Sequence, residues 1–164
     1  MERFDVNCTL GRWPEGGPTW ATTGQLLAEM DRLGIGKALV RHTLGRFYDP
    51  AYGNQVLTEE IGGEERLFPC WTALPPNTGE LGPLGPWLSN LLAADVRAIC
   101  LYPKSHGYPL AEWQCAALLA PLAEQHMLLL LELSEVSWEE LHWLCKSYPK
   151  LQVILLNTGY RVLR

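Results

Sequence analysis

The sequence has no apolar stretch near the roughly 20 residues that a membrane-spanning helix requires. Its charged start, Met1-Glu2-Arg3, leads straight into a short apolar segment without the pattern of a signal peptide. Basic residues do not dominate either, because 13 Lys and Arg stand against 18 Asp and Glu for a net charge of -5, and they are scattered along the chain. We therefore predict a cytoplasmic protein that binds neither membranes nor nucleic acid.

Several sequence motifs that indicate metal binding, redox chemistry or nucleotide binding are also missing. The five cysteines include no CxxC pair and no zinc-ribbon spacing, so we expect them to be reduced and mostly buried. No GxGxxG follows the first apolar segment, and GxxxxGK[ST] occurs nowhere. The two common nucleotide-binding motifs of parallel α/β sheets are therefore absent.

What is present is a regular alternation of apolar and amphipathic segments in a chain of 164 residues that is 48% hydrophobic. The alternation recurs about every 30 residues, which is the length of a strand-helix unit. Strands are predicted at Phe4–Leu10, Ala38–Thr43, Leu67–Ala73, Val96–Tyr102, Met127–Leu133 and Val153–Asn157. Helices are predicted at Thr23–Leu33, Ala51–Ile61, Pro83–Ala94, Leu110–Gln125 and Ser137–Ser147.

The strands are typical of a parallel sheet, because Met127–Leu131 is apolar at every position, as in a strand covered on both faces. A complete (β/α)8 barrel takes about 250 residues, and this chain supplies only about six units. We predict one α/β domain over residues 1–164, an incomplete barrel of the TIM type that is truncated at its C-terminal end. Its first and last strands would be open edges, so we expect a homo-oligomer or an aggregation-prone chain.

Polar side chains gather where the predicted strands end. The first strand ends in Asn7 and Thr9, which lie two residues apart and so project to the same face, while Cys8 between them faces away. The fifth strand ends in Glu132 and the sixth in Asn157. Because the loops after parallel strands share one face of such a fold, these side chains predict a functional site there.

Several short motifs, in order along the chain, resemble the amidohydrolase superfamily and within it the amidohydrolase-related family. Asp5–Gly11 resembles the first-strand motif D-x-H-x-H-x-G of that family. Leu27–Val40 is similar to its helix and second strand, Arg66–Cys70 to its RF-x-P strand, and Val96–Pro103 to its fourth strand. The resemblance covers nearly the whole chain and implies a (β/α)8 barrel of metal-dependent hydrolases and decarboxylases.

The resemblance also implies a divalent metal, typically zinc, but this sequence lacks the corresponding ligands. Asn7 and Thr9 stand where the family has two histidines, and Glu132 and Asn157 stand where it has histidines on strands five and six. Neutral amide and hydroxyl oxygens bind zinc poorly. We therefore predict a degenerate metal site that does not hold a metal ion tightly, and we assign no metal ligand.

The candidate catalytic residues are Glu132, Lys104 and His106. Glu132 interrupts a leucine run at a strand end, where a carboxylate must face a cavity or find a partner such as Lys104 or Arg41. His106, in a loop at the same face, could act as an acid or base near neutral pH. Candidate ligand-binding residues are Asn7, Thr9, His42, Asn157 and Tyr160.

Two functions agree with these observations. The first is an amidohydrolase-like hydrolase with an altered site, acting on a small organic substrate. The second is a non-catalytic relative that binds a ligand or a partner through the former active-site face. The residues alone leave both open.

Overall fold

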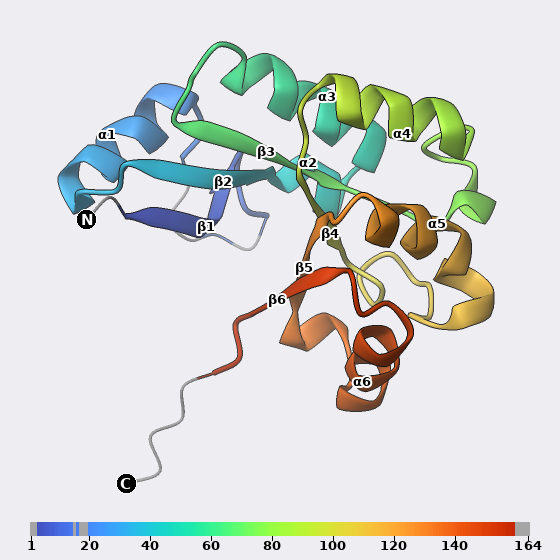
Figure 1. The fold of residues 1–164 in the computed structure, drawn as a ribbon. Coiled ribbons are helices and arrows are strands. Elements are labelled where there is room, and N and C mark those ends of the chain that lie inside the picture. The colour runs from blue at the N-terminus through green and yellow to red at the C-terminus, as the bar shows by residue number, and fades with distance from the viewer. Residues whose placement is uncertain (1–2, 15, 17–19, 160–164) are drawn as a thin grey trace, which may run out of the picture.

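In the computed structural model, which describes residues 3–14, 16 and 20–159, parallel strands form one curled sheet (Figure 1). The sheet is six-stranded, and its spatial order follows the chain from β1 to β6, as the sequence predicts. The strands are β1 (Phe4–Leu10), β2 (Lys37–His42), β3 (Leu67–Thr72), β4 (Ala98–Leu101), β5 (Leu128–Glu132) and β6 (Gln152–Leu156). Since each strand pairs in parallel with the next, all of their carboxyl ends lie at one end of the sheet.

Helices connect successive strands and lie on the outer side of the curl (Figure 1). They are α1 (Thr23–Leu33), α2 (Thr43–Phe47), α3 (Pro50–Ile61), α4 (Leu84–Ala93), α5 (Glu112–Glu124) and α6 (Trp138–Ser147), with short 3-10 turns η1 (Pro76–Thr78) and η2 (Leu133–Glu135). Local signals set several helix starts. Thr22 and Asp49 cap α1 and α3 through their side chains, and Ser137 forms a capping box with Glu140 at α6.

Helix α2 is the one helix among the described residues that the sequence pattern does not predict. It has 5 residues and begins directly after β2, where the His42 ring accepts a hydrogen bond from the Leu44 backbone N–H. A helix this short has no amphipathic period to read. It lies tightly against α3, because a Cβ atom added to Gly53 would fall 2.2 Å from the backbone nitrogen of Gly45.

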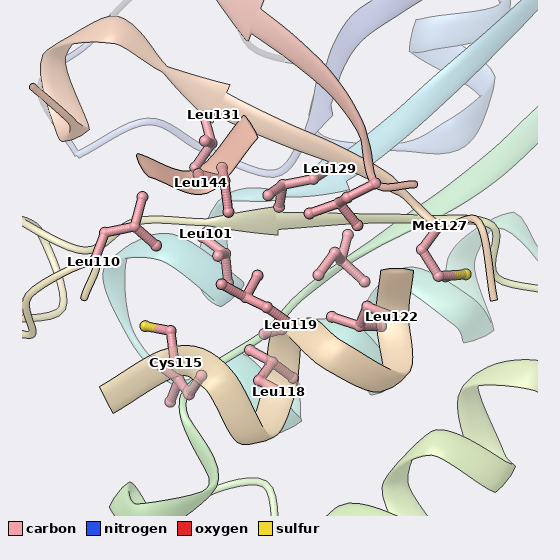
Figure 2. Packing of buried hydrophobic residues seen from close by; sticks show 14 of the residues in the cluster. Leu101, Leu110, Cys115, Leu118, Leu119, Leu122, Met127, Leu129, Leu131 and Leu144 are labelled. Atoms are coloured by element: carbon pink, nitrogen blue, oxygen red, sulfur yellow. The ribbon is translucent and has the colours of Figure 1, made fainter. Parts of the chain in front are cut away.

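The sheet buries apolar side chains on both faces. On the outer face, leucines of β4 and β5 pack against α5 and α6 (Figure 2), and Leu129 and Leu131 are fully covered there. Alternate residues of β4 and β5, together with residues of the neighbouring strands, form a second cluster on the inner face, which includes Cys100, Leu130 and Cys70 of β3. This two-residue alternation is what a parallel sheet covered on both sides requires.

The cysteines follow the same division between buried and exposed positions. All are free, four are buried, and Cys145 is exposed. Cys8 belongs to the cluster packed against α1 and α3, so it faces away from Asn7 and Thr9 as the sequence predicts. Among the described residues, no helix is long and apolar enough to cross a membrane. The homo-oligomer expected from the open strand edges stays a prediction.

Candidate functional site

A cavity of about 300 Å³ opens at the carboxyl ends of the strands on the inner face of the sheet. The sequence-predicted residues Asn7, Thr9, Glu132 and Asn157 all line it, although they lie on strands β1, β5 and just after β6. The remaining lining residues are Trp13, Gly16, Trp20 and Arg41. The topology thus unites four residues that are up to 150 positions apart in the chain, because parallel strands present their ends together.

Arg41 occupies the centre of this arrangement. It lies on the inner face of β2, is 4% exposed, and its Nη1 donates to the Tyr102 hydroxyl at 3.1 Å and to Glu132 Oε1 at 3.2 Å. Its Nη2 donates to Asn7 Oδ1. Burial opposes the charged form, but the neighbouring polar groups, Tyr102 first and Glu132 among them, outweigh it and raise the pKa of Arg41 above its ordinary value. Arg41 is therefore a permanent cation that links β2 to β1, to β5 and to Tyr102, the residue directly after β4.

Glu132 is paired through both of its oxygens. Oε1 accepts from Arg41, and Oε2 accepts from Arg46 Nη1 at 2.9 Å. Arg46 Nη2 in turn donates to Glu135 Oε1 at 3.0 Å. We call the alternating series Arg41, Glu132, Arg46 and Glu135 the arginine–glutamate chain. Its burial is tolerable because every charge has an opposite neighbour.

Arg46 comes from α2 and was not singled out by the sequence reasoning, which also left Arg41 without a site role. Its guanidinium carbon lies 4.8 Å from the Tyr102 ring centroid, 5.2 Å from that of Phe47 and 6.0 Å from that of Trp13. These are cation–π distances. The available signal was the position of Thr43–Phe47 immediately after a strand, in a loop region that such folds use for function.

Lys104 and His106 do not line the cavity. Lys104 Nζ donates to the carbonyl of Ser134 at 2.8 Å, so it is not the partner of Glu132. His106 Nε2 donates to the carbonyl of Arg46 at 2.9 Å, since a carbonyl can only accept. The other nitrogen, Nδ1, is buried and has no hydrogen-bond partner among the described residues. His106 therefore supports the backbone of α2 from behind the arginine–glutamate chain.

His42 was predicted as a ligand-binding residue, and the structure places it outside the strand-end cavity. Adjacent strand residues point to opposite faces, so Arg41 projects inward and His42 projects toward the helices. There His42 Nε2 lies 3.6 Å from the Glu60 carboxylate, and burial lowers the pKa of His42. It lines a separate cavity of about 440 Å³. Tyr160, the remaining candidate, lies outside the described residues.

The residues at the strand ends do not fit a zinc ion. The described residues contain no group of three or more His, Cys, Asp or Glu side chains that could hold one. Glu132 is the sole carboxylate in the described cavity lining, and both of its oxygens accept from guanidinium groups. Cys8 offers no thiolate, because burial first and Asp5 second raise its pKa to about 12.

Several solved structures have a fold similar to that of this chain at low sequence identity. No protein-family model and no curated protein sequence matches the chain. Among solved structures, a probable 2-pyrone-4,6-dicarboxylic acid hydrolase from Acinetobacter baumannii, crystallised with citric acid bound, is similar over 94% of this chain, with 15% identity and a TM-score of 0.69. An uncharacterised TIM-barrel protein from Bordetella bronchiseptica is similar over 93%, with 10% identity and a TM-score of 0.65. An amidohydrolase from Mycobacterium avium subsp. paratuberculosis is similar over 84%, with 15% identity and a TM-score of 0.55.

The chain spans 58%, 66% and 48% of the lengths of these three proteins. At such low identity the likeness establishes the architecture and leaves the chemistry to the residues described above. The chain therefore has the fold of an incomplete (β/α)8 barrel of the TIM type.

Proposed function

We propose that this chain is an amidohydrolase-related barrel protein that binds a small organic ligand at the strand ends without a catalytic metal ion. The architecture supports the relationship, since the similar structures include a hydrolase and an amidohydrolase. The observation that carries the proposal is the double pairing of Glu132 with Arg41 and Arg46. It favours the binding alternative over metal-assisted hydrolysis.

The arginine–glutamate chain and a metal ion compete for the same groups. The Arg41 guanidinium donates hydrogen bonds to both Asn7 and Glu132. By the sequence resemblance, these two residues stand where the amidohydrolase-related family has metal-binding histidines. A divalent cation bound to Asn7 and Glu132 would have to displace the Arg41 guanidinium from them, and the two positive charges would still repel each other at close range. Its remaining ligands would be neutral oxygens, which hold zinc poorly. Arg41 thus supplies the positive charge of this site.

The three predicted catalytic residues are all hydrogen-bonded to other groups of the protein, which favours a structural role for them. A general base must have a lone pair within hydrogen-bond reach of its substrate or of a water. Each Glu132 oxygen is held by a guanidinium group, Lys104 donates to the Ser134 carbonyl in η2, and His106 donates to the Arg46 carbonyl. We propose that Glu132 and His106 position the two arginines, and that Asn7, Thr9 and Asn157 contact the ligand.

Metal content tests the first half of the proposal. We expect elemental analysis of the purified protein to find far less than one zinc ion per chain, and added zinc to leave its melting temperature unchanged. Stoichiometric zinc that disappears in Glu132→Ala would contradict the proposal and restore a hydrolase with an unusual metal site. Glu65→Gln, an exposed turn residue, is the control for a change in net charge.

Ligand binding tests the second half. A fragment screen by thermal shift should yield compounds whose effect is reduced by Thr9→Val, which removes a hydroxyl at nearly constant volume. Asn157 has a φ of 54°, so Asn157→Gly removes its carboxamide without straining the backbone. Both variants should weaken binding while Glu65→Gln does not. A screen in which no compound responds to either variant would overturn the proposed site.

A further inference from the structure

The charges at the strand-end cavity cancel within the protein. Arg41 and Glu132 are the charged side chains of the described lining, and they are hydrogen-bonded to each other at 3.2 Å. Behind them Arg46 is matched by Glu135 at 3.0 Å. The arginine–glutamate chain therefore has two positive and two negative members and no net charge. The site needs no ionic ligand to complete it.

An organic acid would have to disrupt this balance. Both terminal nitrogens of Arg41 already donate, to Tyr102, Glu132 and Asn7. These bonds use three of the five N–H donors of the guanidinium, and a carboxylate bound at the remaining Nη2 hydrogen would lie close to the Glu132 carboxylate and be repelled by it. An organic cation that approached Glu132 would lie close to the Arg41 guanidinium, which is hydrogen-bonded to that carboxylate and would repel the cation. The cavity thus disfavours charge of either sign.

The uncharged polar groups of the lining are the ones left free. The Thr9 hydroxyl and the Asn157 carboxamide have no hydrogen-bond partner among the described residues. The amide oxygen of Asn7 accepts a hydrogen bond from Arg41, so its NH2 group is left as a donor. Together these side chains offer both donors and acceptors without charge. They are complementary to an amide or a ring lactam, which also presents both.

Two tryptophans, Trp13 and Trp20, line the cavity. Trp20 is fixed beside β1 by a backbone bridge to Leu10 and by its carbonyl, which accepts from the Gly11 N–H at 3.0 Å. Trp13 packs edge-on against Phe47 at 5.4 Å between ring centroids. Anchored aromatic side chains bind planar rings well because little conformational entropy is lost. A volume of about 300 Å³ is at the lower end for ligand pockets, which indicates a single ring.

We infer that the ligand of this site is an uncharged, planar, single-ring compound bearing an amide or lactam group, and not an organic acid. The inference rests on the proposed function and narrows its ligand class. It differs from the fold likeness alone, because one similar protein holds citric acid and is described as acting on a dicarboxylic acid. The determining feature is the internal pairing of Arg41 with Glu132.

Matched neutral and charged probes test the inference. Benzamide and benzoate, and nicotinamide and nicotinate, differ mainly in the charge of one substituent. We expect the two amides to bind at least tenfold more tightly than the acids in ligand-observed NMR titrations of the intact chain at pH 7.5. Binding should weaken in Thr9→Val and in Trp20→Leu, and should be unchanged in Glu65→Gln.

A charge change at Glu132 sharpens the test. Glu132→Gln removes the carboxylate that neutralises Arg41, so the variant should gain affinity for benzoate relative to benzamide. Glu65→Gln changes the net charge equally at an exposed turn and should leave the order of affinities as it is in the original protein. If Glu132→Gln does not fold, Asn157→Asp adds a negative charge at the exposed rim of the cavity and should weaken benzoate binding by a larger factor than it weakens benzamide binding.

The outcomes separate the inference from the proposed function. Acids that bind as tightly as the amides, through Thr9 and Trp20, would overturn the inference and leave metal-free ligand binding in place. Absence of cavity binding by all four probes would also overturn it. Stoichiometric zinc, or a fragment screen insensitive to Thr9→Val, would instead overturn the proposed function and the inference with it.

Discussion

Removal of the Glu132 carboxylate should strongly destabilise the protein. Glu132 is 6% exposed, and Glu132→Ala would leave Arg41, which is 4% exposed, without its ionic partner. At an effective dielectric constant of about 20, an ion pair at 3.2 Å gains about 5 kcal/mol before desolvation is subtracted. Breaking a buried pair by deleting one partner costs about 3 to 5 kcal/mol, because the remaining charge is buried and uncompensated.

We therefore expect Glu132→Ala to lower the free energy of unfolding by about 3 to 5 kcal/mol. In a domain of this size, about 1 kcal/mol corresponds to about 2 to 4 °C in melting temperature, so a fall of about 6 to 20 °C should follow. Urea unfolding followed by tryptophan fluorescence gives the free energy, and circular dichroism gives the melting curve. Glu65→Ala, which removes an exposed carboxylate, should change stability by less than about 0.5 kcal/mol.

A double-mutant cycle identifies the partner. If Arg41 and Glu132 form the pair described here, Arg41→Ala and Glu132→Ala should be less than additive, with a coupling energy of about 0.5 to 3 kcal/mol. Lys104→Ala combined with Glu132→Ala should be additive, since Lys104 is bonded to Ser134 instead. A loss below about 1 kcal/mol in Glu132→Ala, or additivity with Arg41→Ala, would refute a buried arginine–glutamate chain.

Three further outcomes follow from the fold. Burial lowers the pKa of His42 below its ordinary value of 6.5, so the unfolded chain binds more protons than the folded one, and the free energy of unfolding should fall as the pH drops below about 6.5. The variant His42→Asn keeps an acceptor for the Leu44 N–H at the start of α2. It should reduce this pH dependence, measured by urea unfolding between pH 7.5 and 5.5. Gly53→Ala should destabilise by about 1 to 3 kcal/mol by forcing α2 away from α3, whereas Gly85→Ala, with open space around it, should stabilise by about 0.4 to 1 kcal/mol in the same assay. A thiol reagent such as DTNB should modify Cys145 alone in the folded chain and all five cysteines in urea; rapid reaction of a second thiol under native conditions would contradict the buried positions.

The order and direction of the strands were readable from the sequence because they depend on local pattern. Apolar runs at a regular interval, separated by amphipathic helices with their own caps, allow few arrangements other than a parallel sheet in chain order. The two-residue period of a strand also fixed that Asn7 and Thr9 share a face and that Cys8 does not. Parallel topology then sufficed to bring Glu132 and Asn157 to the same end.

The two-residue period alone could not place His42. Its neighbour Arg41 and His42 cannot both face the cavity from one strand, and the choice between them depends on which face of β2 packs against helices. Val40 and Ala38 share the face of His42 and are buried against α1 and α3, which decides the orientation. From the sequence alone both faces of β2 are apolar, so the pattern does not distinguish them.

The pairing of charges was decided by the tertiary structure. Glu132 had Lys104 and Arg41 as possible partners, and the nearer one in sequence is not the one it contacts. Arg41 lies 91 residues away and reaches Glu132 because the sheet curls and brings the inner faces of β2 and β5 toward each other. Arg46 reaches the same carboxylate through α2, a helix too short to leave a pattern. Sequence periodicity determines which face a side chain occupies, whereas contacts across a curved sheet depend on its curvature and on the length of each side chain, which no local pattern encodes.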